Sequence, residues 1–122
     1  MRVLVAYESE YRLYMEATAA AIREFRSNSE VVVAEAGELE ADVERFDPHL
    51  VITSPPIPSN PVDEQPAMIE LSPETNQPSR FWVGERRWES TNPTLGEILS
   101  VVDETKRLLR TSREREEFPD AG

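Results

Sequence analysis

Continuous apolar runs mark the first strands that this sequence predicts. Residues 2–7 and 30–36 are rich in valine and do not alternate with polar residues, which is typical of strands covered on both faces. Between them we expect a helix that is capped by Ser9. Its predicted apolar face consists of Tyr11, Met15, Thr18, Ile22 and Phe25. The order strand, helix, strand predicts a right-handed βαβ unit whose first strand is central in a sheet.

The pattern continues with a short helix that ends at the Asp47–Pro48 step, because a residue before proline avoids the helical region. A third strand is expected over residues 49–54. It begins with the only histidine, His49, which we interpret as an edge residue rather than a catalyst. Five prolines then fall within residues 55–66 and exclude a regular helix interior. We therefore expect no helix on this connection.

Two further strands are predicted over residues 67–72 and 80–85. Only residues 73–79 separate them, which is fewer than the roughly twelve residues that a parallel crossover with a helix requires. Either these two strands pair antiparallel, or an extended loop replaces the helix. Residues 86–91 then extend the second of these strands or form a short ribbon with it.

A capping box formed by Thr94 and Glu97 predicts that the last helix starts at residue 95, with Pro93 and Ile98 placed for a hydrophobic staple. The helix is expected to run to about Arg110 or a turn or two beyond. Its predicted apolar face consists of Leu95, Ile98, Leu99, Val102 and Leu109. Residues 111–122 are rich in arginine and glutamate, which predicts a flexible acidic tail after a single domain over residues 1–110.

Composition removes several function classes. The 122 residues include 24 acidic and 13 basic side chains, and the formal net charge of −11 disfavours direct binding to nucleic acid or to a membrane. The chain has no cysteine and one histidine, which excludes disulfides, a cysteine nucleophile and a multi-histidine metal cluster. The start of the sequence has no signal-peptide pattern, so we expect a cytoplasmic protein.

Three segments resemble the receiver domains of two-component response regulators: RVLVAYESE at residues 2–10, DPHLVITS at 47–54 and PAMIELS at 66–72. The resemblance implies an α/β, flavodoxin-like sheet of about five mostly parallel strands with three helices. The prolines of residues 55–66 and the short connection over residues 73–79 predict that loops replace the third and fourth crossover helices. The resemblance also implies a regulatory role in signalling or transcription. In that family two neighbouring carboxylates and a phosphoacceptor aspartate hold Mg²⁺ against a phosphoryl group at the carboxyl ends of the strands.

The residues that match this pocket have lost its chemistry. Tyr7 stands at the first position of the acidic pair, and only Glu8 is retained. The phosphoacceptor position is Ser54, whose hydroxyl cannot form an acyl phosphate. Ser72 matches the hydroxyl residue that contacts the phosphoryl group, and residues 86–91 contain no counterpart of the family's lysine. We expect a degenerate phosphorylation pocket, and hence a pseudo-receiver that is not an enzyme and uses no metal or cofactor.

The two missing helices move the expected function to a sheet face. Apolar side chains on that face would lack their usual cover, which leaves three possible coverings: the proline-rich loop, the segment of Trp82 and Trp88, or a second protein chain. An exposed apolar patch usually marks an interface. The composition typical of interface hot spots occurs in Phe81, Trp82, Arg86, Arg87 and Trp88. Phe81 and Trp82 can equally fill the core, whereas Trp88 has charged neighbours and is the better interface candidate. We expect contact with a protein partner or a homodimer.

Alternative functions remain open at this point. Residues 2–14 also resemble the start of flavodoxins, which makes a flavin-binding or small-ligand protein the second interpretation. Residues 8–13 contain two acidic side chains and no glycine, so they make a poor phosphate cradle. A third interpretation is an oxygen-ligated metal around Glu8, Glu10 and Glu70. Ser54 and Ser72 could be kinase substrates, although small polar residues at strand ends more often form turns.

Overall fold

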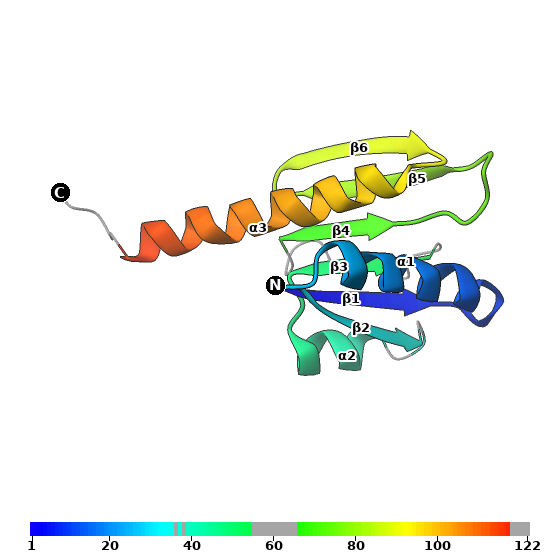
Figure 1. The fold of residues 1–122 in the computed structure, drawn as a ribbon, viewed down its shortest axis with the longest axis horizontal. Helices are drawn as coiled ribbons and strands as arrows, with labels where there is room; N and C mark the ends of the chain where they lie inside the picture. The colour runs from blue at the N-terminus through cyan, green and yellow to red at the C-terminus, as the bar shows by residue number, and fades with distance from the viewer. Residues whose placement is uncertain (36, 38, 55–65, 118–122) are drawn as a thin grey trace.

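The chain forms one mixed sheet with helices on both faces, an α/β arrangement (Figure 1). This computed structural model describes residues 1–35, 37, 39–54 and 66–117, and their side chains apart from those of residues 39, 40 and 112–117. The strands are β1 (Arg2–Tyr7), β2 (Glu30–Glu35), β3 (Leu50–Thr53), β4 (Ala67–Glu70), β5 (Pro78–Val83) and β6 (Arg86–Thr91). The helices are the 3₁₀ helix η1 (Ser9–Tyr11), α1 (Arg12–Phe25), α2 (Leu39–Phe46) and α3 (Leu95–Glu117).

The strand order is β2-β1-β3-β4-β5-β6. The first four strands in this order are parallel, and β5 and β6 each pair antiparallel with the preceding strand. The expected α/β sheet is confirmed and three of its five pairings are parallel, but it has six strands instead of about five, and a flavodoxin-like fold is not established. The other two pairings are antiparallel, which is one of the two alternatives that the sequence left open for β4 and β5. The physical reason is the short connection over residues 71–77, which contains no helix, so the chain turns back beside β4.

The central strands were located correctly, but the position of β2 was not. β1 lies between β2 and β3, as its continuous apolar sequence predicts. β2 has an equally apolar sequence, yet it forms an edge of the sheet, where Val31 is buried and Val32 is exposed. The apolar pattern of a strand indicates that its side chains can be buried, but it does not indicate how many strands pair with it. The short ribbon expected over residues 86–91 is confirmed as β6.

Helices α1 and α3 pack on one face of the sheet, and α2 packs on the other face beside β1 and β2 (Figure 1). The core under α1 and α3 is the larger one. Its buried residues include Val5, Ile52, Ile69, Phe81 and Val102. On the opposite face the buried cluster consists of Leu4, Ala6, Val51 and Met68. This second cluster is small because it lies on fewer strand positions.

Helix α1 differs from its prediction at both ends. Ser9 does not cap it, because Ser9 lies in η1, and Tyr11 precedes α1 without a capping side-chain hydrogen bond. The buried residues of α1 are Met15, Ala19 and Ile22, which follow the spacing of a single helical face. Phe25 was assigned to this face but is 54% exposed. The small Ala19, which the prediction omitted, completes the contact with the sheet.

Helix α3 starts where the sequence predicts, and its end at Glu117 lies within the two turns beyond Arg110 that the prediction allowed. Thr94 Oγ1 accepts a hydrogen bond from the Glu97 N–H at 3.2 Å, which confirms the first half of the capping box. The Glu97 carboxylate makes no return bond among the described residues, and its buried Oε2 has no partner. The helix ends at Glu117, so residues 111–117 of the predicted tail are helical. The rest of that tail lies outside the described residues, as do residues 55–65 of the proline-rich connection.

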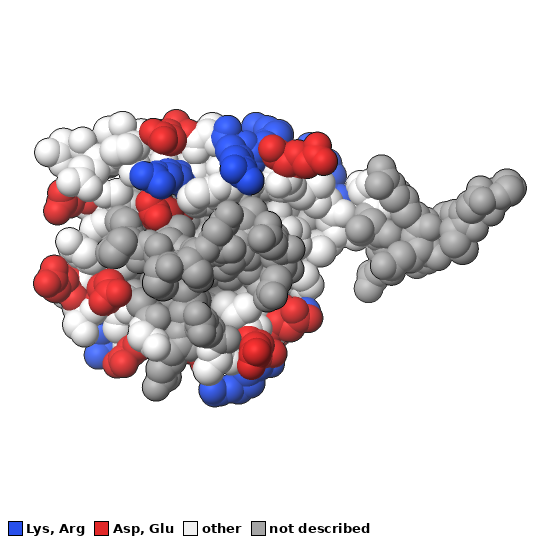
Figure 2. Space-filling view, turned by 180° about the vertical axis from the view of Figure 1, so that it is seen from behind, with Lys and Arg blue, Asp and Glu red and all other residues white. Residues whose placement is uncertain are grey.

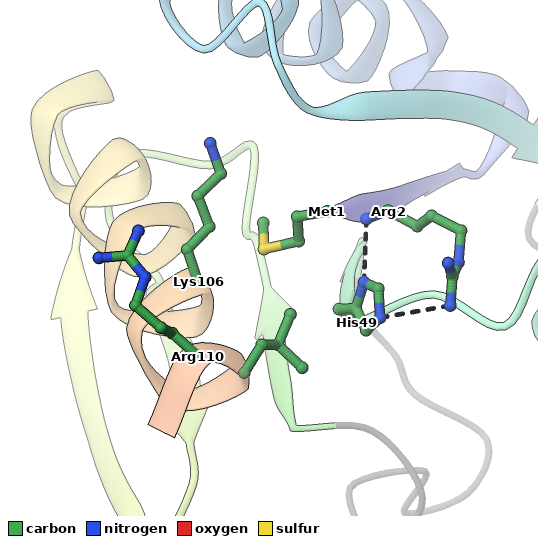
Figure 3. A pocket seen from close by; sticks show the side chains of 6 residues that line it. Met1, Arg2, His49, Lys106 and Arg110 are labelled. Carbon is green, nitrogen blue, oxygen red and sulfur yellow. Dashed lines mark hydrogen bonds between the residues drawn. The ribbon is translucent and has the colours of Figure 1, made fainter. Parts of the chain in front are cut away.

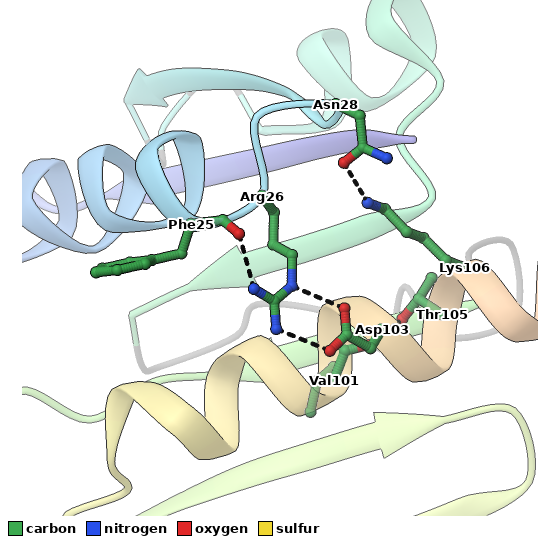
Figure 4. A network of polar contacts seen from close by, with 7 residues as sticks. All are labelled: Phe25, Arg26, Asn28, Val101, Asp103, Thr105 and Lys106. Carbon is green, nitrogen blue, oxygen red and sulfur yellow. Dashed lines mark hydrogen bonds and ion pairs between the residues drawn. The ribbon is translucent and has the colours of Figure 1, made fainter.

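Polar contacts join the two helices on the larger core (Figure 4). Arg26, just after α1, donates two hydrogen bonds to the Asp103 carboxylate of α3, at 2.8 and 2.9 Å. Lys106 of α3 donates to Asn28 Oδ1 at 2.7 Å. The hydrogen bonds from Arg26 lower the pKa of Asp103. The end of α1 and the middle of α3 are therefore held together over the sheet.

Candidate functional site

The carboxyl ends of β1, β3 and β4 lie side by side and form one edge of the sheet, which differs from the edges formed by the outer strands β2 and β6. Ala6 is level with Thr53, and Thr53 is level with Glu70, so the residues that follow these positions come together. The Leu71 N–H donates to the Thr53 carbonyl at 2.7 Å and extends this pairing past the end of both strands. The predicted pocket residues of these three strands therefore belong to the same edge. Ligands of open α/β sheets commonly bind at such an edge.

Two serines at this edge have different environments. Ser54 is 1% exposed, and its Oγ has no hydrogen-bond partner in the part of the chain that the structure describes. Ser72 is also buried, but its N–H donates to Ser79 Oγ at 2.8 Å and its Oγ accepts from the Glu74 N–H at 3.3 Å. Ser72 thus takes part in the turn after β4, which is the turn-forming role that the sequence left open. Neither hydroxyl is presented to solvent.

At the position that the resemblance matches to the acidic pair, the structure has an aromatic ring with a cation beside it. Tyr7 packs against the larger core, and the Arg12 guanidinium carbon lies 5.7 Å from the centre of its ring. Arg12 also donates to Glu16 Oε1 at 3.0 Å, and this bond raises the pKa of the guanidinium. Glu8 is exposed, and its carbonyl accepts the Tyr11 N–H that closes η1. Sequence reasoning missed Arg12, although its i,i+4 spacing to Glu16 was visible.

The three carboxylates of the metal hypothesis are not arranged for an ion. Glu70 is buried and its Oε1 lies 3.6 Å from the Arg80 Nε of the neighbouring strand. Glu8 and Glu10 are exposed beside η1. Within residues 1–35, 41–54 and 66–111, whose side chains are described, no three acidic or histidine side chains form a group that could hold a metal ion.

The five predicted interface residues divide between the two faces of the sheet. Phe81 is fully buried in the larger core, so it takes the core role and not the interface role. Trp88 stacks on Phe81 with 5.1 Å between ring centres, and Arg86 lies over Trp88 at 4.8 Å while pairing with Glu104. Trp82 points to the opposite face, where it packs against the smaller cluster. The two-residue period of β5 explains this separation.

The sheet face that the sequence leaves without two helices is covered, and Trp82 packs against it, as one of the open alternatives proposed. Val51 and Met68, which lie on that face, are each 1% exposed. Charged side chains lie farther across the same face, where β5 and β6 contribute Arg80, Arg87 and Glu89. Figure 2 views the sheet from this side and shows acidic and basic side chains interleaved along the upper edge. The surface that remains near β6 is therefore polar.

A separate pocket lies at the opposite ends of the strands (Figure 3). It is lined by Met1, Arg2, His49, Lys106, Leu109 and Arg110. The Arg2 N–H donates to His49 Nδ1 at 3.0 Å, which supports the structural role expected for the histidine. Burial and the charge of Arg2 lower the pKa of His49. Two of the cations here already have partners, since Arg2 bonds to the Asp47 carbonyl and Lys106 bonds to Asn28.

Comparisons with known proteins add no assignment. No family model, no curated protein and no solved structure matches the chain. None of the described helices has both the length and the apolar character needed to cross a membrane. The features that bear on function are the carboxyl ends of β1, β3 and β4 and the surface near β6.

Proposed function

We propose that this chain is a non-catalytic pseudo-receiver that acts in signalling or transcriptional regulation through contact with protein. The observation that carries this proposal is the state of Ser54. It occupies the matched phosphoacceptor position, yet its side chain is buried, and among the described residues its hydroxyl has no partner that could act as a base. A serine in this environment is neither accessible to a phosphoryl donor nor activated for attack.

The environment of Tyr7 supports the same proposal. A receiver-like reaction needs a divalent cation beside the acceptor, held by carboxylates. Here the matched position carries an aromatic ring, and the Arg12 guanidinium, which is paired with Glu16, lies next to it. The only matched carboxylate is Glu8, and it is exposed. The positive charge of Arg12 disfavours binding of a divalent cation at the same place. We therefore expect this site to remain in one state and not to switch on phosphorylation.

The arrangement of the first four strands gives the receiver resemblance its structural support. Strands β2, β1, β3 and β4 are parallel in that order, and α1 and α2 lie on opposite faces, as a doubly wound sheet requires. The antiparallel β5 and β6 then replace the remaining crossover. We propose that regulation passes through this altered half, because its outer strand ends the sheet and is largely exposed.

The flavin-binding alternative finds no specific support. A phosphate cradle needs converging N–H groups in a loop free of negative charge. The loop after β1 instead has the exposed side chains of Glu8 and Glu10, and its first turn is η1, a single 3₁₀ turn. We do not propose this function.

The proposal is tested by offering the protein a phosphoryl donor and a phosphoryl mimic. The full chain is incubated with Mg²⁺ and acetyl phosphate, and separately with Mg²⁺ and beryllofluoride, alongside an intact receiver domain as a positive control. We expect no added mass in the intact protein and no change in tryptophan fluorescence or melting temperature. A covalent phosphate on the chain, or a clear response to beryllofluoride, would show that the pocket is active and would overturn the proposal.

A further inference from the structure

The outer edge of β6 offers main-chain hydrogen-bonding groups to a partner. β6 is the last strand in the sheet order, and among the described residues no strand pairs with its outer side. An open edge strand is a ready template for another strand, and polar or charged side chains normally restrict which strand can pair. The identity of the possible partner therefore depends on which side chains flank that edge.

The hairpin geometry identifies the outward-facing main-chain groups. Gly84 has a φ of +59° and begins the two-residue connection between Val83 and Arg86, which places those two residues in a hydrogen-bonded pair. The Gly84 N–H donates to the Pro66 carbonyl at 2.9 Å, so even-numbered positions of β5 face β4. The odd-numbered positions of β5 therefore face β6.

The alternation then continues across the hairpin into β6. The residues of β6 opposite the odd positions of β5 are Arg86, Trp88 and Ser90, and these bond inward. The main-chain groups of Arg87, Glu89 and Thr91 must point to the open side. A second antiparallel strand can use them only if it pairs outward positions with outward positions.

Charge alternates across the polar face in the same rows. Glu70 of β4 contacts Arg80 of β5, and Arg80 is level with Glu89 of β6. The row thus reads acid, base, acid from β4 to the open edge. The next strand would continue this alternation if it placed a basic side chain opposite Glu89, because opposite charges directly across an antiparallel pair are favourable.

A second copy of β6 provides that basic side chain. Two copies related by a two-fold axis at Trp88 pair Glu89 with Arg87 of the partner subunit, and Arg87 with Glu89 of the partner subunit. The two Trp88 side chains then become direct neighbours on the other face, in a non-hydrogen-bonded pair where side chains approach closely. A two-fold axis at Glu89 would instead bring two glutamates together, and an axis at Arg87 would bring two arginines together. The charges therefore select the axis at Trp88.

We propose that this chain forms a homodimer by antiparallel pairing of two β6 strands about Trp88, with reciprocal Arg87–Glu89 ion pairs. This inference rests on the proposed function, since it specifies the protein contact as a second copy of the chain. The contact extends the sheet across both subunits and leaves the edge near Tyr7 and Ser54 outside the interface. Its two exposed ion pairs make the contact sensitive to salt.

Sedimentation equilibrium of the full chain at tens of micromolar tests this inference by charge exchange. Arg87→Glu places two acidic side chains opposite each other, and Glu89→Arg places two basic ones opposite each other. Each of these like-charge pairs occurs twice in a symmetric dimer. We expect either change alone to raise the dissociation constant about tenfold or more. The double variant Arg87→Glu with Glu89→Arg restores opposite charges and should restore dimerisation. Arg45→Glu makes the same charge change on α2, in a side chain that is 75% exposed, and should leave dimerisation unchanged.

Circular dichroism of each variant separates loss of folding from loss of pairing. A wild-type chain that stays monomeric at tens of micromolar would overturn the β6 dimer, as would an Arg87→Glu variant that dimerises like the wild type. Failure of the double variant to recover would contradict the axis at Trp88. These outcomes leave the proposed function to its own test, because an inert response to phosphoryl donors and mimics is measured independently of subunit number.

Discussion

Two buried serines beside the candidate site should respond to alanine substitution in opposite directions. Ser54 is 1% exposed and Ser79 is fully buried, so both hydroxyls are removed from water. Ser79 Oγ accepts the Ser72 N–H at 2.8 Å, whereas Ser54 Oγ has no partner. Since both substitutions remove the same atom from a similar depth, the difference between them isolates the value of the hydrogen bond.

The expected magnitudes follow from these partners. Ser79→Ala leaves the buried Ser72 N–H without an acceptor, which costs about 1–3 kcal/mol of the free energy of unfolding. Ser54→Ala removes a hydroxyl that has lost water and gained no partner, and we expect a gain of about 1 kcal/mol. The two variants should therefore differ by about 2–4 kcal/mol. For a chain of 122 residues, the gain of about 1 kcal/mol in Ser54→Ala raises the melting temperature by roughly 3–5 °C.

Urea unfolding followed by tryptophan fluorescence measures both free energies, and calorimetry measures the melting temperatures. The wild-type m-value should be retained in both variants, because neither change alters the surface exposed on unfolding. Loss of more than about 0.5 kcal/mol in Ser54→Ala would refute the reasoning. It would show that this hydroxyl is hydrogen-bonded in solution, and the description of the pocket as inert would then need revision.

Three further predictions concern the ends of helices and the titrating groups. Thr94→Ala should lower the free energy of unfolding by about 1 kcal/mol in chemical denaturation, because it removes the acceptor of the Glu97 N–H. Glu97→Gln should change it by less than about 0.5 kcal/mol, since the Glu97 carboxylate makes no return bond among the described residues. Asp103→Asn should cost at most about 1 kcal/mol at pH 7, because its ion pair with Arg26 is partly solvated. The lowered pKa of Asp103 means that the wild type loses this advantage as pH falls below about 4, so unfolding curves of the two proteins should converge there. The ring of His49 should titrate below 6.5 in an NMR pH series, because burial and the charge of Arg2 disfavour its protonated form, and a midpoint above 6.5 would contradict its described environment.

Local signals in the sequence were sufficient for most element positions. The apolar runs of β1 and β3 located two central strands, because a strand covered on both faces needs apolar side chains at every position. The Asp47–Pro48 step located the end of α2, and Thr94 located the start of α3. The short connection after β4 also restricted the next pairing to two possibilities. Each of these features depends on residues within a few positions of one another.

The candidate site was located only in part. The sequence placed Tyr7, Glu8, Ser54 and Ser72 at strand ends, and the parallel register brings those ends to one edge. The burial of Ser54 and the position of Arg12 over Tyr7 could not be predicted from strand ends. A side chain's exposure and its contacts across elements depend on how the surrounding elements pack, and no local pattern records this.

By itself, the sequence determined that this protein has an α/β sheet, that a helix begins after Thr94, and that the matched phosphoacceptor aspartate is absent. The tertiary structure alone decided that β2 and β6 are the edges of the sheet and that Phe81 and Trp82 lie on opposite faces. The reason is that periodicity of two or of 3.6 residues assigns neighbours along one element. Strand order, burial and the choice of edge arise from contacts between segments far apart in the chain, as the bonds between Arg26 and Asp103 illustrate.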